Sequence, residues 1–230
     1  MDAAAQLKEA LQKMPQLIGE RLCLDFANTV EPRGGISTHH TSLRDYLTSY
    51  TDLIAWGYHA HLLTEERSLH LLREVEQRPD DALAQWKRAI ALRETIYRVF
   101  WLMANHEQPS QADLDALRQE YLAAVNHSWL VKQGDRFVWQ WEEDDRALDQ
   151  LLWPIAQSVT TLLTGEDLER IKVCPGVPGD PVLCAWLFFD TSKNRNRQWC
   201  SMADCGSVVK ARRLTERRRA ARASRATRSS

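Results

Sequence analysis

The residues of this 230-residue chain best suited to binding a metal are four cysteines in its last quarter. They are Cys174, Cys184, Cys200 and Cys205, separated by nine, fifteen and four residues. Thiolates grouped as two pairs are the ligands that a tetrahedral Zn²⁺ ion prefers in structural sites. No histidine follows His127, so these thiolates form the ligand set, with buried free thiols as the alternative. The spacing predicts one structural zinc ion.

A strongly basic segment follows the last of these cysteines. Positions 210–228 hold nine Lys or Arg and a single acid, Glu216. Such a cationic helix attracts a phosphate backbone, although a charge run of this kind can also be solvated or disordered. The candidate nucleic-acid contacts are Arg195, Arg197, Lys210, Arg212, Arg213, Arg217 and Arg218.

The overall charge of -1 conceals a division between an acidic body and a basic tail. Residues 1–170 carry 17 Lys and Arg against 27 Asp and Glu, whereas residues 171–230 carry 13 against 4. An anionic partner would therefore meet the tail and be repelled by the body.

Short elements must bring the cysteines together. The sequence predicts two strands, residues 186–190 and 195–199, joined as a hairpin that places Cys184 beside Cys200. A helix is expected from about Ser207 into the basic tail. Because so small a module has little apolar area, we expect zinc binding to be its main stabiliser.

The rest of the chain has mostly helical periodicity, so the predicted fold class is mainly α. We expect Thr64 and Ser110 to cap helices, a long helix over about 80–105, and a helix over 145–163 that Pro154 kinks. Alternating apolar residues predict one hairpin over 129–141. The predicted division is a helical domain over 1–165 that folds without zinc, a zinc finger over 171–216 and a disordered basic tail over 217–230.

Three polar residues stand in the most apolar helices of the body: Asp25, Asn28 and Arg93. A buried charge needs a partner, so an Asp25–Arg93 pair is one interpretation. The functional alternative is a pocket that senses a small-molecule effector and repositions the finger.

The N-terminus has no apolar core of a signal peptide, and no apolar run approaches the roughly 20 residues that span a bilayer. We therefore expect a cytoplasmic protein without membrane contact, in which clustered cysteines bind metal rather than form disulfides. The lone Cys23, between Leu22 and Leu24, is expected to be a buried apolar residue.

Two sets of sequence motifs are similar to known families. The run WLFFDTSKNR (186–195), then RQWCSM (197–202) and Cys205-Gly206, resembles the CGNR zinc finger. LCLDFANTV (22–30), LRETIYR (92–98) and LLWP (151–154) resemble the helical ABATE domain that precedes this finger. The resemblance covers nearly the whole chain and implies a stress-induced bacterial transcription regulator that binds DNA through its finger.

The chain departs from the family pattern in two places. The signature Cys-Gly-Asn-Arg reads Cys205-Gly206-Ser207-Val208 here, so the polar Asn and Arg are replaced. Cys174 and Cys184 are also farther apart in sequence than the family's first ligand pair. Ser207 can still cap a helix, whereas Val208 cannot contact a phosphate.

These observations predict a DNA-binding transcription regulator of low sequence specificity. An RNA- or ribosome-associated zinc module and a zinc-stabilised protein-interaction adapter are the alternatives, since a zinc module with a basic helix also suits folded RNA. No convergent acid–base or nucleophile set stands out, so we do not expect an enzyme.

Overall fold

The computed structural model describes residues 2–34, 44–142, 144, 146–165, 167–180 and 183–226, with side chains up to residue 218. The helices are α1 (Ala3–Leu11), α2 (Leu22–Ala27), α3 (Tyr50–His59), α4 (Glu65–Gln77), α5 (Pro79–Ala104), α6 (Gln111–Val125), α7 (Leu152–Leu163) and α8 (Ser207–Ala226). Three antiparallel strand pairs accompany them: β1 (Val30–Glu31) with β2 (Arg44–Asp45), β3 (Ser128–Gln133) with β4 (Arg136–Trp141), and β5 (Ile171–Val173) with β6 (Leu187–Phe189). Short helical turns precede β5 (Leu168–Arg170) and α8 (Met202–Gly206).

The mainly α fold class is confirmed, and several helices begin where local chemistry predicts. The Thr64 hydroxyl accepts a hydrogen bond from the Arg67 amide at 3.2 Å, and Ser110 accepts one from Asp113 at 3.1 Å. Pro79 opens α5, where its missing N–H costs nothing. The hairpin over 129–141 is also confirmed, as β3–β4.

The predicted kink at Pro154 is wrong, because the last body helix begins later than expected. Helix α7 starts at Leu152, which makes Pro154 its third residue. Backbone N–H groups in the first turn of a helix have no intrahelical acceptor, so proline breaks no hydrogen bond there.

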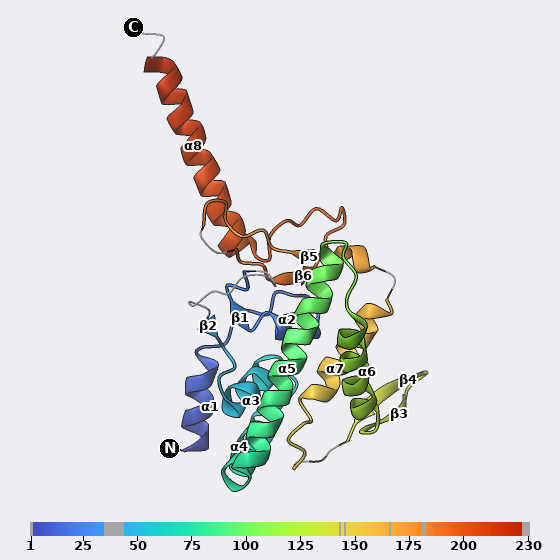
Figure 1. Cartoon of the computed structure of the whole chain (residues 1–230). Coiled ribbons are helices and arrows are strands. Elements are labelled where there is room, and N and C mark those ends of the chain that lie inside the picture. The colour runs from blue at the N-terminus through green and yellow to red at the C-terminus, as the bar shows by residue number, and fades with distance from the viewer. Residues whose placement is uncertain are drawn as a thin grey trace.

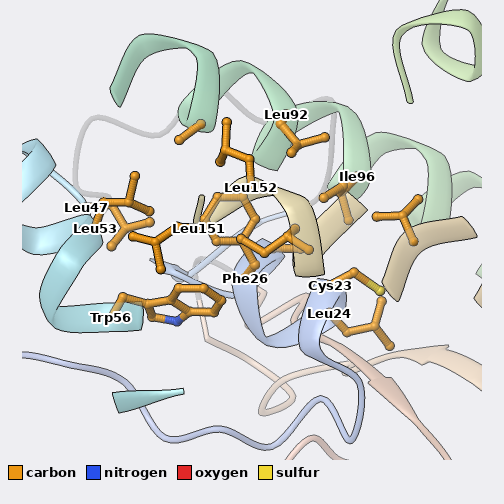
Figure 2. Close-up of a cluster of buried hydrophobic side chains, with 14 of the residues drawn as sticks. Cys23, Leu24, Phe26, Leu47, Leu53, Trp56, Leu92, Ile96, Leu151 and Leu152 are labelled. Carbon is orange, nitrogen blue, oxygen red and sulfur yellow. The ribbon is translucent and has the colours of Figure 1, made fainter. Parts of the chain in front are cut away.

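The body's core forms where α2 meets α3, α5 and α7 (Figure 2). The rings of Phe26 and Trp56 lie 5.0 Å apart at their centroids and both are fully buried. Cys23 is completely buried in the same cluster, and burial raises the pKa of its thiol to about 12. As expected, Cys23 is a buried residue of the apolar core.

The predicted strand pairing in the finger is wrong. Strand β6 pairs with β5, Val173 opposite Leu187, while residues 195–199 form no strand. The cause is Asp190, whose carboxylate accepts hydrogen bonds from the backbone N–H of Ser192 and Arg197, at 2.9 and 3.0 Å. These bonds fold residues 190–197 around the carboxylate as a loop.

The finger's strands share the body's core. Ile171, Leu187 and Phe189 belong to the same buried cluster as α2, α5 and α7. The Asn28 side chain accepts from the Leu187 N–H at 2.9 Å and donates to the Leu187 carbonyl at 2.8 Å. The two predicted domains therefore lie on one continuous hydrophobic core.

Helix α8 leaves this core and projects away from the rest of the molecule (Figure 1). It continues to Ala226, and residues 227–230 of the tail expected over 217–230 lie outside the described part. Among the described helices, none is long and apolar enough to cross a membrane.

Candidate metal centre

The first two cysteines are placed by an extension of the β5–β6 ladder. The Cys174 amide donates to the Trp186 carbonyl at 2.8 Å, and the Ala185 amide donates to the Cys174 carbonyl at 3.1 Å. These bonds hold the end of β5 beside the segment that enters β6. Cys184, one residue before Ala185, is thereby brought next to Cys174.

The loop between these two cysteines turns through glycines. Gly176 has φ +68°, and a Cβ atom on it would lie 2.8 Å from the Cys184 nitrogen. Both the left-handed backbone and the close approach require glycine. The long loop therefore closes tightly against the second ligand.

Cys200 precedes the short helical turn Met202–Gly206 that leads into α8, and Cys205 lies within this turn. The Ser201 hydroxyl accepts hydrogen bonds from the amides of Ala203 and Asp204, both at 3.2 Å, which caps this turn. The turn returns the chain so that the two thiols lie on the same side. Helix α8 then starts at Ser207, two residues after the last ligand.

The four sulfurs form a compact set with the dimensions of a zinc site. All lie within 4.8 Å of one another, with Cys184–Cys200 at 3.6 Å and Cys200–Cys205 at 3.8 Å. Zn–S bonds of about 2.3 Å in a tetrahedron place neighbouring sulfurs about 3.8 Å apart. The cluster therefore fits one structural Zn²⁺ held by thiolates.

Apolar side chains enclose the site on the body side. Cys174 and Cys200 are buried and cluster with Tyr46, Trp186 and Phe188. The Trp186 ring is 7% exposed and its Nε1 donates to the Val30 carbonyl at 2.8 Å. Trp186 therefore packs against the cysteine cluster and is held there by the Val30 carbonyl.

Asp190 is an organising residue that the sequence reasoning missed. Its carboxylate is fully buried and pairs with the Lys172 ammonium at 2.5 Å. Although burial alone would raise the pKa of Asp190, hydrogen bonds from Lys172 and Ser192 bring it down to about 2. Its place directly after three apolar residues and before Thr-Ser was the available signal, because an Asx turn suits that pattern.

Three of the predicted phosphate contacts are engaged within the protein. Arg197 donates to the carbonyls of Ile18 and Trp199 and lies over the Phe188 ring at 4.5 Å. Arg195 pairs with Asp167 at 3.0 Å, and Arg212 pairs with Asp180 at 2.7 Å and donates to the Pro178 carbonyl at 2.7 Å. Arg197 thus ties the N-terminal segment to the finger, and Arg212 anchors α8 to the loop before Cys184.

The other four predicted contacts lie together on α8. They are Lys210, Arg213, Arg217 and Arg218, all exposed and, among the described residues, without an ion-pair partner. Positions 210, 213 and 217 follow helical spacing, so they form one stripe along the helix. The Ser207 hydroxyl donates to the carbonyls of Ala203 and Asp204. Val208, which replaces the arginine of the family signature, is 41% exposed.

In the described part of the chain, Asp25, Asn28 and Arg93 each bind a different partner. Arg93 forms a bidentate pair with Asp45 on β2, at 2.7 Å for both bonds, so the Asp25–Arg93 pair does not form. Asp25 instead accepts a hydrogen bond from the Gly19 amide at 2.7 Å, and the Asn28 side chain binds the Leu187 backbone through two hydrogen bonds. The choice of Asp45 depends on β1–β2 pairing, which brings β2 beside the end of α2 and which local pattern does not reveal.

Comparison with known proteins agrees with this arrangement. A family model named ABATE, described as "Putative stress-induced transcription regulator", matches residues 20–166, and the model of the CGNR zinc finger matches residues 170–218. Both descriptions are of regulatory or zinc-binding modules, and neither is enzymatic. A search of curated proteins gives no match. The ABATE match alone spans more than half of the sequence, and the chain belongs to the ABATE family, with a CGNR zinc finger at its C-terminal end.

Proposed function

We propose that this protein is a transcription regulator that binds duplex DNA through α8, with the zinc finger fixing the base of the helix. The observation that carries the proposal is the stripe of Lys210, Arg213 and Arg217 on a helix that projects from an acidic body (Figure 1). An isolated helix of this kind fits the major groove, and its cations would neutralise phosphates. The family description as a transcription regulator supports the same function.

The charge distribution favours an end-on approach. Helix α8 places its cations at a distance from the body, whose residues 1–170 carry an excess of ten acidic groups. Repulsion by the body would keep the DNA at the exposed part of α8. Arg195, Arg197 and Arg212 would contribute less, because their donors already serve Asp167, the Ile18 carbonyl and Asp180.

The test is a salt titration of full-length protein on duplex DNA. Four phosphate contacts, from Lys210, Arg213, Arg217 and Arg218, predict a slope of log K against log[salt] of about -4. Arg213→Gln with Arg217→Gln should weaken binding to all sequences alike and flatten the slope by about two units.

The matched control removes two arginines from the body, Arg73→Gln and Arg118→Gln, which are equally exposed but lie far from α8 in sequence. This control should bind as wild type does. Unchanged DNA binding by the α8 variant would refute the proposal in favour of a protein-interaction adapter. Stronger competition by structured RNA than by duplex DNA would identify an RNA-binding module instead.

A further inference from the structure

A cavity of about 740 Å³ lies at the seam between the ABATE body and the finger. Helix α7 and the start of α2 form one side, and strand β6 with the segment before β5 forms the other. Its apolar surface comes from Leu22, Pro154, Leu162 and Phe189. This volume lies within the range of about 300–1,000 Å³ that small-molecule sites occupy.

Arg21 brings an unpaired positive charge to this cavity. Its guanidinium lies 3.9 Å from the centroid of the Phe189 ring and donates to the Glu20 carbonyl at 2.6 Å. Among the residues with described side chains, no carboxylate pairs with it. Four of the five N–H donors of the guanidinium therefore remain for a ligand.

The second arginine of the cavity is already neutralised. Arg170 pairs with Asp167 at 2.9 Å and donates to the Asp190 carbonyl at 2.9 Å. Among the described lining residues, the charged side chains are Arg21, Arg170 and Asp167, which together carry one net positive charge. A single negative charge on the ligand would balance it, whereas a phosphate dianion would not.

A hydroxyl donor completes the polar side. The Ser158 oxygen accepts a hydrogen bond from the Cys23 amide at 3.1 Å, which leaves its own proton to donate. Thr161 and Thr191 lie on the same cavity lining. Arginine, hydroxyls and an apolar wall together suit a carboxylate attached to a hydrocarbon body.

We propose that this seam cavity binds a small organic monoanion, an aliphatic or aromatic carboxylate, whose carboxylate pairs with Arg21 and whose apolar body lies against Phe189 and Leu162. The site is independent of the proposed DNA binding, because none of its residues belongs to α8. The cavity is lined by residues of both the ABATE segment and the CGNR segment. Arg170 of the lining donates to the carbonyl of Asp190, the residue that organises the loop 190–197 of the finger.

The experiment uses zinc-loaded full-length protein and the fluorescent probe 8-anilinonaphthalene-1-sulfonate, a monoanion with an aromatic body. We expect one probe site per chain, from which octanoate displaces the probe. Octylamine and inorganic phosphate should compete at least tenfold more weakly, because the first has the wrong charge and the second lacks the apolar body. Equal competition by octylamine or by phosphate would overturn the assignment of the ligand class.

Two variants approach the cavity from opposite sides. Arg21→Gln should weaken octanoate binding by about tenfold or more, the usual effect of losing one charge-assisted hydrogen bond. Thr161→Trp, at an exposed position on α7, should block the cavity without burying a polar group. Arg118→Gln, exposed on α6 and outside the lining, is the control that should bind as wild type does. Absence of probe binding, or binding that survives both Arg21→Gln and Thr161→Trp in folded, zinc-loaded protein, would refute the site.

Discussion

Cys200 is the ligand whose removal should open the metal site most completely, since its sulfur lies within 4 Å of both Cys184 and Cys205 and its side chain is buried. Cys200→Ser should lower the zinc content, measured by elemental analysis, from about one ion per chain to well below that. Cys23→Ala removes a buried thiol that is not a ligand, so it should keep its zinc. Full zinc occupancy in Cys200→Ser would contradict the four-thiolate assignment.

Asp25 gives the molecule a pH dependence with a defined sign. Burial is the largest influence on its carboxyl and raises its pKa from 3.8 to about 6, in spite of the Gly19 amide. The folded state therefore holds a proton that the unfolded state releases near pH 4. The stability that this proton provides is complete below pH 4 and is lost as the pH rises through 6.

The corresponding experiment compares wild type with Asp25→Asn by urea unfolding at pH 5 and pH 7.5, with the zinc content of both proteins measured at each pH. A shift of this size predicts that wild type loses about 1–2 kcal/mol more than Asp25→Asn over this range. Asn keeps the acceptor for Gly19 but cannot ionise. Parallel pH profiles would show that Asp25 does not titrate in this window.

At the scale of elements, the loop between Cys174 and Cys184 offers a test of local geometry. Gly176 and Gly134 both have left-handed backbones, with φ +68° and +64°, but only at Gly176 would a Cβ meet an atom, the Cys184 nitrogen. Gly134→Ala should therefore cost only the backbone term of about 1 kcal/mol. Gly176→Ala should cost more and weaken zinc binding, which a chelator competition measures. Equal effects of the two substitutions would show that the close approach is unimportant.

The elements also show which features sequence can predict. The caps at Thr64 and Ser110 depend on residues three positions away, so local pattern was sufficient for them. The thiolate set followed from ligand chemistry alone, and the CGNR and ABATE resemblances were confirmed by the family matches. The wrong strand pairing in the finger arose because the carboxylate of Asp190 competes with strand hydrogen bonds, which hydrophobic alternation does not report.

The sequence also did not reveal which residues pair across long distances along the chain. Arg197 resembled a free phosphate contact until its acceptor, the Ile18 carbonyl, was known, and that residue is 179 positions away. Asn28 resembled a pocket residue, but it binds Leu187 across 159 positions. A polar side chain indicates that it needs a partner, whereas only the fold identifies which partner it has.

At the scale of the whole molecule, the shared core changes what zinc removal should do. The sequence suggested a body over 1–165 that folds without metal. In the structure, Leu187 and Phe189 of the finger lie in the body's core, and the Tyr97 hydroxyl donates to the Ala185 carbonyl at 2.9 Å. Losing the finger's order would remove both Leu187 partners of the buried Asn28 side chain, at a cost of about 1–3 kcal/mol for each polar group left unsatisfied.

We therefore expect thermal unfolding of the zinc-loaded protein, followed by helical circular dichroism, to occur as one transition. A chelator should lower the midpoint of that transition by about 10 °C or more, since a loss of 1 kcal/mol moves Tm by about 2–4 °C in a protein of this size. Asn28→Ala should reproduce part of this loss while retaining zinc, because it breaks the connection between body and finger without touching a ligand. The control Asn126→Ala, at the end of α6 and outside this interface, should leave both properties unchanged. Two separate transitions, with only the smaller one sensitive to the chelator, would show that the body folds independently after all.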